Sequence, residues 1–195
     1  ESVTAGGSGK ATAAADIAQL TLGVETEGAT TEAAREKNAE AVQAAVDFLT
    51  GMGVAESDIK TERIYLSEQY DGGYQMSTRM TVLVREVDRA GEAIDGVVNA
   101  GVNSIYDVEY GVADEAALYE QALENAAADA KESAQKMAEA AGRTLGDVIS
   151  VEESSYGGAT LVRQQAEDGS FTDATLSAPG DLSVTAEVRV IYELK

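Results

Sequence analysis

The most constraining feature of this sequence is a long helical pattern whose inner stripe is almost entirely alanine. The pattern runs from about Asp114 to Ala141, with Asp114 as the expected N-cap and Gly142 just beyond the end. The apolar positions at helical spacing are Leu118, Ala122, Leu123, Ala126, Ala130, Ala134, Met137 and Ala141. Because alanine side chains are short, we expect the axis of this helix to lie unusually close to whatever it covers.

Shorter sequence patterns before and after this helix predict two further helices and the strands of a sheet. A second helix is expected from Thr30 or Thr31 to Gly51, and a third from about Asp88 to Asn99. Apolar and polar residues alternate, or apolar residues cluster, in segments that predict strands at 18–24, 58–70, 74–85, 105–110, 145–152 and 182–192. Asp71-Gly72-Gly73 is a strong signal for a hairpin turn. The predicted order is β-α-β-β-α-β-α-β-β, an α+β fold with a mixed or antiparallel sheet and helices packed on one face.

The length of the chain predicts one domain. Its 195 residues, 44% of them hydrophobic, suffice for a core without disulfides. Glycine-containing pairs interrupt residues 154–180, where periodicity is weak. We therefore predict a single domain over 1–195 with a long flexible loop at 154–180, a length that is usually functional or disordered.

Charge and residue types narrow the classes of function. The chain is acidic, with 14 Lys and Arg against 35 Asp and Glu and a net charge of −21, so nucleic acid is not an expected partner. It contains no His and no Cys, which removes the usual general base, the thiolate nucleophile and the commonest transition-metal ligands. No apolar run approaches the roughly 20 residues of a membrane-spanning helix, so no direct membrane insertion is expected.

Several short motifs occur in an order that resembles one bacterial family. They are Val3 to Gly9 with a G-x-G, Ala15-Asp16, Leu22 to Thr26, Ser57 to Thr61 with D-I-x-T, Tyr70 with Gly73-Tyr74, Ala100 to Asn103, the alanine-rich 122–141, and Pro179-Gly180 before 184–194. Each motif is weak alone, but their order and spacing together resemble the SIMPL-domain family. The absence of the family's Pro before Asp16 is a departure that concerns entry into a strand.

The resemblance implies a bacterial periplasmic or extracellular domain of unknown function with no established enzymatic activity. It implies an extracytoplasmic location, in the periplasm, at the cell surface or secreted. Since no signal peptide is visible, we expect that a leader has been removed from this sequence. Self-association is plausible for the family, so we expect a homo-oligomer. A further protein partner is possible and unidentified, with envelope stress or surface interaction as the expected setting.

Motifs that suggest catalysis or ligand binding are incomplete. Gly6-Gly7-Ser8-Gly9-Lys10 lacks the first Gly and the final Ser or Thr of a phosphate-binding loop, and is interpreted as a glycine-containing strand start or bulge. Asp168 to Asp173 lacks the calcium-loop pattern. We predict no catalytic residue, no cofactor and no metal site. The alternative function is a carboxylate-dependent hydrolase acting on cell-envelope polymers, with Glu152, Glu153, Glu167 or Asp168 as its acids.

Three tyrosines form the candidate interaction surface. Tyr65, Tyr70 and Tyr74 flank the turn at 71–73, where aromatic side chains can anchor a partner or simply stabilise the hairpin, the second of these being favoured. Asn38 interrupts the apolar stripe of its helix and is expected to bond nearby backbone. Exposed edges of the final and N-terminal strands are the expected assembly surfaces. The predicted function is a non-catalytic extracytoplasmic protein acting through protein contacts or self-assembly.

Overall fold

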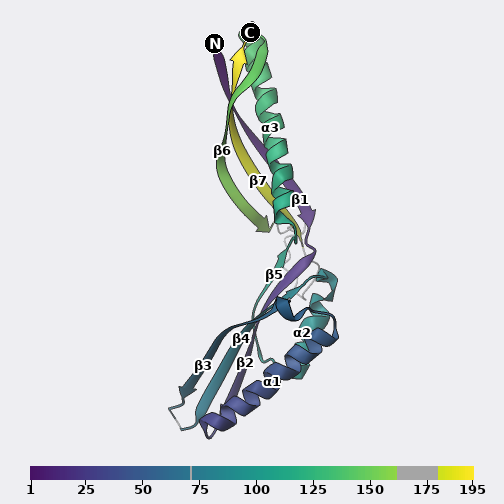
Figure 1. Ribbon diagram of the computed structural model, residues 1–195, viewed down its shortest axis with the longest axis vertical. Helices are drawn as coiled ribbons and strands as arrows, with labels where there is room; N and C mark the ends of the chain where they lie inside the picture. Colours follow the sequence, from purple (N-terminus) through teal and green to yellow (C-terminus); the bar gives the residue numbers. More distant parts are fainter. Residues whose placement is uncertain (71, 162–179) are drawn as a thin grey trace, which may run out of the picture. The chain divides into compact units, whose positions relative to one another are not determined.

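The computed structural model describes residues 1–70, 72–161 and 180–195 (Figure 1). Contacts divide this part of the chain into two compact units, each with its own sheet. Unit 1 contains residues 1–14, 114–161 and 180–195, and unit 2 contains residues 15–70 and 72–113. The described chain has seven strands in two antiparallel sheets and three α-helices, which confirms the α+β class. Organisation as one domain over 1–195 stays a prediction.

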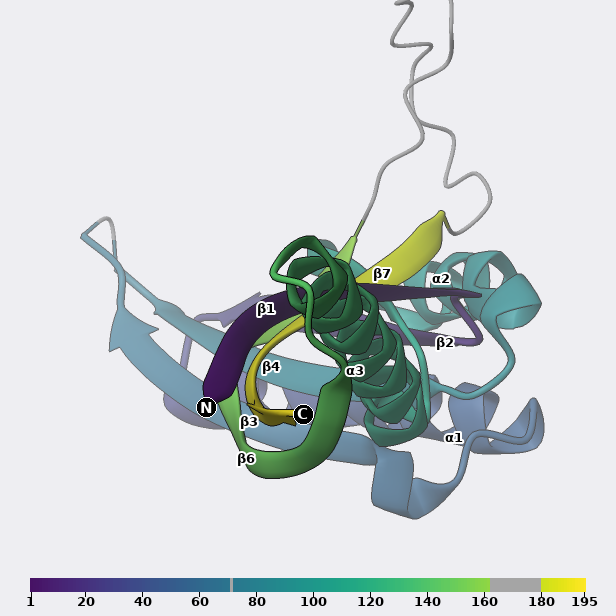
Figure 2. The ribbon, with the colours of Figure 1, turned by 90° about the horizontal axis from the view of Figure 1, so that it is seen from above.

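Unit 1 is a three-stranded antiparallel sheet with one helix. Its strands are β1 (Ser2–Ala14), β6 (Leu145–Leu161) and β7 (Asp181–Leu194), in the order β1-β7-β6. Helix α3 (Glu115–Ala140) lies along β1 and β7 (Figures 1 and 2). Alternate residues of β7 face this helix and are buried, namely Leu182, Val184, Ala186, Val188, Val190 and Tyr192. The period-2 pattern of the final strand is thus the apolar face of this sheet.

Helix α3 packs closely on β1 because both contact surfaces are made of small residues. Ala122, Ala126 and Ala130 on the helix are fully buried. A Cβ atom added to Gly9 would stand 2.1 Å from the carbonyl oxygen of Ala122, so only a residue without a side chain fits there. The expectation of a close helix approach is confirmed. The predicted Asp114 N-cap is also present, since its side chain accepts a hydrogen bond from the Ala117 amide.

Unit 2 is a four-stranded antiparallel sheet with two helices on one face. Its elements are β2 (Ile17–Gly28), α1 (Thr31–Gly51), β3 (Ile59–Glu68), β4 (Tyr74–Val84), α2 (Ala90–Ala100) and β5 (Ser104–Gly111), with short 3₁₀ turns at Glu56–Asp58 and Val87–Arg89. The strand order is β3-β4-β2-β5. Thr30 caps α1 as predicted, accepting a hydrogen bond from the Ala33 amide.

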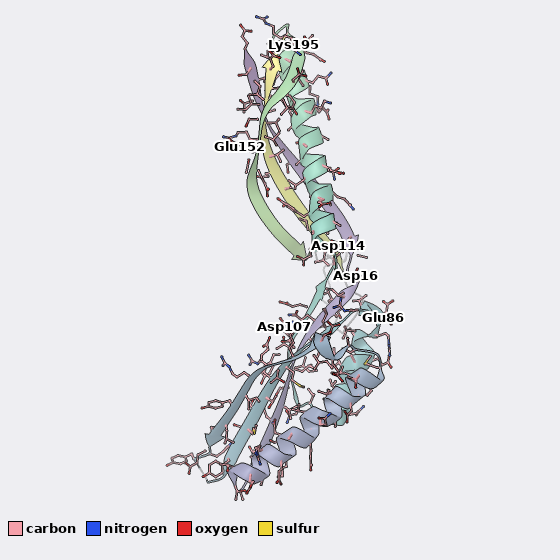
Figure 3. The ribbon with its side chains drawn as sticks, viewed as in Figure 1. Asp16, Glu86, Asp107, Asp114, Glu152 and Lys195 are labelled. Atoms are coloured by element: carbon pink, nitrogen blue, oxygen red, sulfur yellow. The ribbon has the colours of Figure 1, made fainter. Side chains whose placement is uncertain are left out.

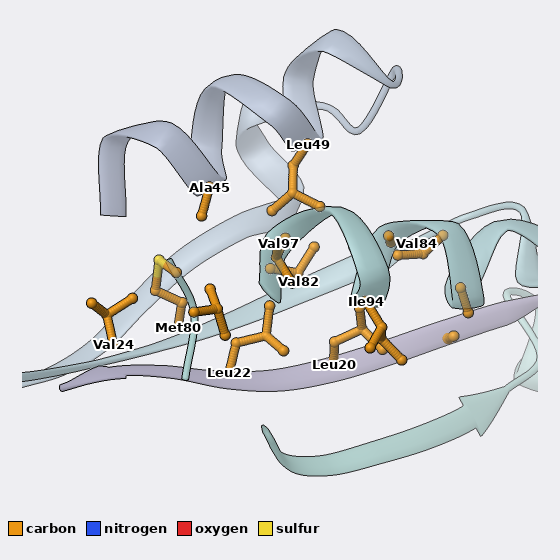
Figure 4. Close-up of a cluster of buried hydrophobic side chains, with 14 residues drawn as sticks. Leu20, Leu22, Val24, Ala45, Leu49, Met80, Val82, Val84, Ile94 and Val97 are labelled. Carbon is orange, nitrogen blue, oxygen red and sulfur yellow. The ribbon is translucent and has the colours of Figure 1, made fainter. Parts of the chain in front are cut away.

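The core of unit 2 lies between the two central strands and the helices. Figure 4 shows apolar side chains of β2 and β4 directed toward those of α1 and α2. The labelled residues of this core are Leu20, Leu22, Val24, Ala45, Leu49, Met80, Val82, Val84, Ile94 and Val97. Because these residues come from one face of the sheet, the opposite face contributes nothing to this core.

One polar side chain is built into the boundary of this core. Asn38 is 1% exposed and donates its amide to the carbonyl oxygens of Val24 (2.9 Å) and Met76 (3.3 Å). Its own oxygen accepts a 2.5 Å hydrogen bond from the hydroxyl of Thr78. The prediction that Asn38 forms hydrogen bonds with nearby backbone is confirmed. These hydrogen bonds connect α1 to β2 and β4.

Four expectations need correction. Strand β1 precedes the predicted order, which is otherwise matched, and there are two sheets rather than one. Residues 154–161 belong to β6 rather than to a loop, because they continue its pairing with β7, whereas 162–179 lie outside the described residues. The final strand offers no free edge, because β7 is central and pairs with β1 and β6 on its two sides.

Candidate functional site

The face of the unit 2 sheet that points away from α1 and α2 carries the most distinctive group of side chains. Arg63 on β3 lies directly opposite Arg79 on β4, so the two side chains project from the same face. Neither arginine forms an ion pair with any described residue, although other arginines do, as Arg85 does with Asp58. Like charges directly opposite each other destabilise an antiparallel pair. The two opposed arginines therefore lower the stability of the β3–β4 strand pair.

Arg79 is held by an aromatic ring instead of an acid. Its guanidinium carbon lies 4.0 Å from the centroid of the Tyr106 ring, a cation–π contact between β4 and β5. The Tyr106 hydroxyl donates a 3.3 Å hydrogen bond to the Glu25 carboxylate. A ring contact leaves the N–H donors of the guanidinium edge available for an acceptor.

The ring reaches Arg79 because β2 has a glycine beneath it. A Cβ atom on Gly23 would stand 2.6 Å from Cε2 of Tyr106, so a side chain there would displace the ring. Asn103 fixes the start of β5 beside β2, since its side chain exchanges hydrogen bonds of 2.9 and 2.7 Å with the backbone of Glu25. Sequence reasoning identified Asn103 and Gly23 as motif residues without a role, and missed Tyr106.

The two arginines border a hollow in this face. It measures about 170 Å³ and is lined by Arg63, Tyr65, Ser77 and Arg79. Ser77 is the direct cross-strand partner of Tyr65, so both side chains lie on this face. The hollow therefore combines two guanidinium groups, a hydroxyl and an aromatic ring, which are donors and a flat apolar wall. We define Arg63, Tyr65, Ser77, Arg79 and Tyr106 as the arginine–tyrosine face.

The three predicted tyrosines do not come together. Tyr65 belongs to the arginine–tyrosine face, and Tyr70 is fully exposed at the turn. Tyr74 pairs with Glu68 and lies three residues from Ser77 on β4, so its side chain projects from the opposite face to that of Tyr65. As one interaction surface they remain a prediction. Asp71, within the predicted turn, lies outside the described residues.

The acids of the hydrolase alternative are not gathered either. Glu152 and Glu153 are consecutive exposed residues of β6 and therefore project to opposite faces (Glu152 is labelled in Figure 3). Glu153 accepts a hydrogen bond from the hydroxyl of Tyr119. Glu167 and Asp168, with the calcium-like segment 168–173, lie outside the described residues. Within 1–70, 72–161 and 180–195, no group of three His, Cys, Asp or Glu side chains is placed to hold a metal ion.

A second hollow, of about 150 Å³, surrounds an ion pair between Asp58, in the 3₁₀ turn before β3, and Arg85, the residue that follows β4. Asp58 accepts bonds of 2.7 and 2.8 Å from Arg85, and Arg89 donates a 2.6 Å bond to the Met52 carbonyl. The hydrogen bond from Arg85 lowers the pKa of Asp58 below its ordinary value. Since all these polar groups are paired with one another, this hollow is interpreted as structural.

Exposed apolar residues are most prominent on two edge strands, β3 in unit 2 and β6 in unit 1, and a smaller group, Ile105 and Tyr106, lies on edge strand β5. Ile64, Tyr65 and Leu66 on β3 and Val148, Ile149 and Val151 on β6 are between 44% and 62% exposed. Each strand has a partner on one side only within the described chain, β4 for β3 and β7 for β6. Their other edges therefore combine free backbone groups with apolar side chains, the combination that favours strand pairing between molecules.

Comparison with known proteins places the chain in a family. The sequence model of the SIMPL family, described as a protein of unknown function (DUF541), matches residues 3–192. The chain belongs to the SIMPL family. The resemblance drawn from the ordered motifs is thus confirmed.

Relatives within the SIMPL family come from several bacteria. The chain is 30% identical to the 26 kDa periplasmic immunogenic protein of Brucella melitensis, over 97% of this chain and 83% of that protein. It is 28% identical to the protein YggE of Escherichia coli K12, over 99% of this chain and 83% of that protein. The ligand-free regulatory subunit of aspartate kinase from Thermus thermophilus is 14% identical over 91% of this chain and 86% of that one. Its TM-score of 0.23 is too low to indicate a shared fold.

Motif residues of the SIMPL resemblance make structural contacts in this chain. Gly7 and Gly9 allow α3 to pack closely on β1, and Asp58 of the D-I-x-T motif accepts hydrogen bonds from Arg85. Asn103 links β5 to β2 through its hydrogen bond to the Glu25 carbonyl. Asp16 accepts a 2.7 Å hydrogen bond from the Ala113 amide, and its carbonyl oxygen accepts one of 3.1 Å from Val87. These motifs therefore specify the fold. The five residues of the arginine–tyrosine face belong to none of them, although Gly23 and Asn103, which position Tyr106, do.

Proposed function

We propose that this SIMPL chain acts through protein contacts, first of all with copies of itself, and carries out no catalysis. The observation that carries the proposal is the pair of apolar edge strands, β3 and β6. Monomeric proteins usually protect such edges with charge, proline or a covering element. In this chain the middle residues of β3 (64–66) and of β6 (148–151) include apolar side chains that are exposed to solvent within their own unit.

Pairing of these strands with another molecule combines two sources of free energy. Unpaired N–H and C=O groups of the edge gain hydrogen-bond partners, as in strand addition. Burial of a large apolar side chain contributes about 1.5–3 kcal/mol when complete. Because the two edges belong to different sheets, one chain offers two separate contacts and can extend an assembly beyond a dimer.

The residue types of the chain support a non-catalytic role. With neither His nor Cys, catalysis would depend on carboxylates, Lys, Tyr, Ser or Thr. The two described acids of the hydrolase alternative project to opposite faces of β6, and a glycosidase needs its two acids to converge on one bond. No described feature favours that alternative.

The periplasmic name of the Brucella relative supports an extracytoplasmic location for this chain, which we include in the proposal. No helix in the described ranges is both long enough and apolar enough to span a membrane. An acidic surface is compatible with an envelope setting, where contacts with other proteins rather than with nucleic acid are available.

Light scattering at physiological salt tests the proposal. A mass above that of the 20.3 kDa monomer, decreasing when a charge is placed on the apolar edges, supports it. A monomer at every accessible concentration contradicts it.

A further inference from the structure

We propose that the arginine–tyrosine face binds a small molecule bearing a carboxylate or phosphate group, with Arg63 and Arg79 as the residues that hold the oxyanion. This inference does not rest on self-association, because it concerns the face of the unit 2 sheet rather than its edge. Its basis is the juxtaposition of two guanidinium groups, a serine hydroxyl and the Tyr65 ring around one hollow, with Tyr106 stacked on Arg79.

The two arginines are placed as a receptor for an anion and not as a stabilising pair. They stand opposite each other across β3 and β4, where their mutual repulsion weakens the hairpin. An oxyanion between them turns that repulsion into two charge-assisted hydrogen-bonded contacts. The guanidinium fork matches the geometry of carboxylate and phosphate oxygens better than an ammonium group does.

Two acids on this face are engaged by hydroxyl groups rather than by the arginines. Glu25 accepts from the Tyr106 hydroxyl, and Glu62 accepts from the Thr81 hydroxyl. Neither forms an ion pair with Arg63 or Arg79, although the chain has 35 acidic residues to 14 basic ones. Among the described residues, no carboxylate therefore occupies the N–H donors of either guanidinium group, which stay available to an oxyanion.

The site is ordered before any ligand arrives. Tyr106 lies against Gly23 and fixes the Arg79 guanidinium from one side, and Asn103 fixes the backbone that carries Tyr106. An arginine whose rotamer is already restricted loses less entropy when it binds. Tyr65, at the side of the hollow, provides a flat surface for the apolar part of the ligand.

Size and charge favour a small ligand over a polymer. A hollow of about 170 Å³ is smaller than the roughly 300–1,000 Å³ of pockets that enclose drug-sized molecules. It accommodates an oxyanion and a few attached atoms. The net charge of −21 repels a polyanion in proportion to that polymer's charge, whereas a ligand with one or two charges is repelled far less.

Titration of the ¹⁵N-labelled chain with benzoate, and separately with inorganic phosphate, at low ionic strength tests this assignment. We expect saturable shifts of the amide signals of Ser77 and Arg79 with at least one of the two anions. Arg63→Gln and Arg79→Gln should each raise Kd at least fivefold and together abolish saturation. Arg35→Gln, which removes an exposed arginine of α1, is the matched control and should leave Kd unchanged.

A stability measurement separates binding from a structural role. If the arginines serve an anion, Arg63→Gln should not lower the urea midpoint, because it removes a repulsion. Shifts that do not saturate with either anion, or a Kd that changes equally in the Arg35 control, overturn the proposal. Saturable binding of an acidic peptide at this face without binding of benzoate or phosphate also overturns it, and points to a protein partner.

Discussion

Gly7 on β1 and Ala126 on α3 are in such close contact that a Cβ atom on Gly7 would stand 2.1 Å from the Ala126 carbonyl oxygen. The obstacle is backbone, so it cannot rotate away. We therefore predict that Gly7→Ala destabilises the protein by about 1–3 kcal/mol through overpacking. Urea unfolding followed by circular dichroism measures the change.

Gly6→Ala is the matched control for this prediction. Gly6 is the neighbouring residue on the exposed face of β1, and a Cβ there meets nothing closer than the Val188 oxygen at 3.9 Å. Its effect should stay within about 0.5 kcal/mol, as for most surface substitutions. Equal effects at positions 6 and 7 would show that helix packing is not the cause.

Asn38→Ala should destabilise the protein by about 2–3 kcal/mol, because it leaves the buried Thr78 hydroxyl and two backbone carbonyls without their side-chain partner. The measurement is again urea unfolding. Gln43→Ala removes an exposed amide of the same helix that bonds Asp47, and should change stability by less than about 0.5 kcal/mol. A loss at Asn38 no larger than at Gln43 would contradict the network.

The Asp58–Arg85 pair predicts a difference in stability that depends on pH. Because Arg85 depresses the pKa of the Asp58 carboxyl in the folded state, the pair stabilises above the unfolded value of 3.8 and the contribution is lost as pH falls through the folded pKa. Comparison of urea midpoints for the wild type and Asp58→Asn tests this. The gap should be largest near neutral pH and narrow below roughly pH 4. A gap that is constant down to pH 3 is inconsistent with this pair.

Local signals predicted the helices but not the first strand. Thr30 and Asp114 cap their helices as expected, because an N-cap depends on residues within one turn. The inward residues of β1 are Ala5, Gly7, Gly9 and Ala11, which have low strand propensity. They form a strand because β7 and α3, more than a hundred residues away, provide pairing and close packing. The family resemblance alone indicated a strand there.

The pairing of Arg63 with Arg79 in the candidate site could have been predicted from the sequence. The hairpin turn sets the register, and five residues outward from the Glu68–Tyr74 pair bring Arg63 opposite Arg79. Tyr106 was not accessible in this way, because the pairing of β5 with β2 shifts at a bulge between Thr21 and Leu22. The position of its ring depends on that irregularity and on Gly23.

The central claim, self-association through apolar edge strands, is tested most directly by sedimentation velocity on edge variants. Ile64→Lys with Leu66→Lys alters β3, Val148→Lys with Val151→Lys alters β6, and Gln43→Lys adds the same charge type at an exposed position of helix α1, away from any strand edge. The wild type and the Gln43 control should sediment above the 20.3 kDa monomer, each edge pair should reduce the mass, and all four edge changes together should give monomer. A wild type that sediments as monomer at all concentrations, or edge variants that assemble like the control, would contradict the claim.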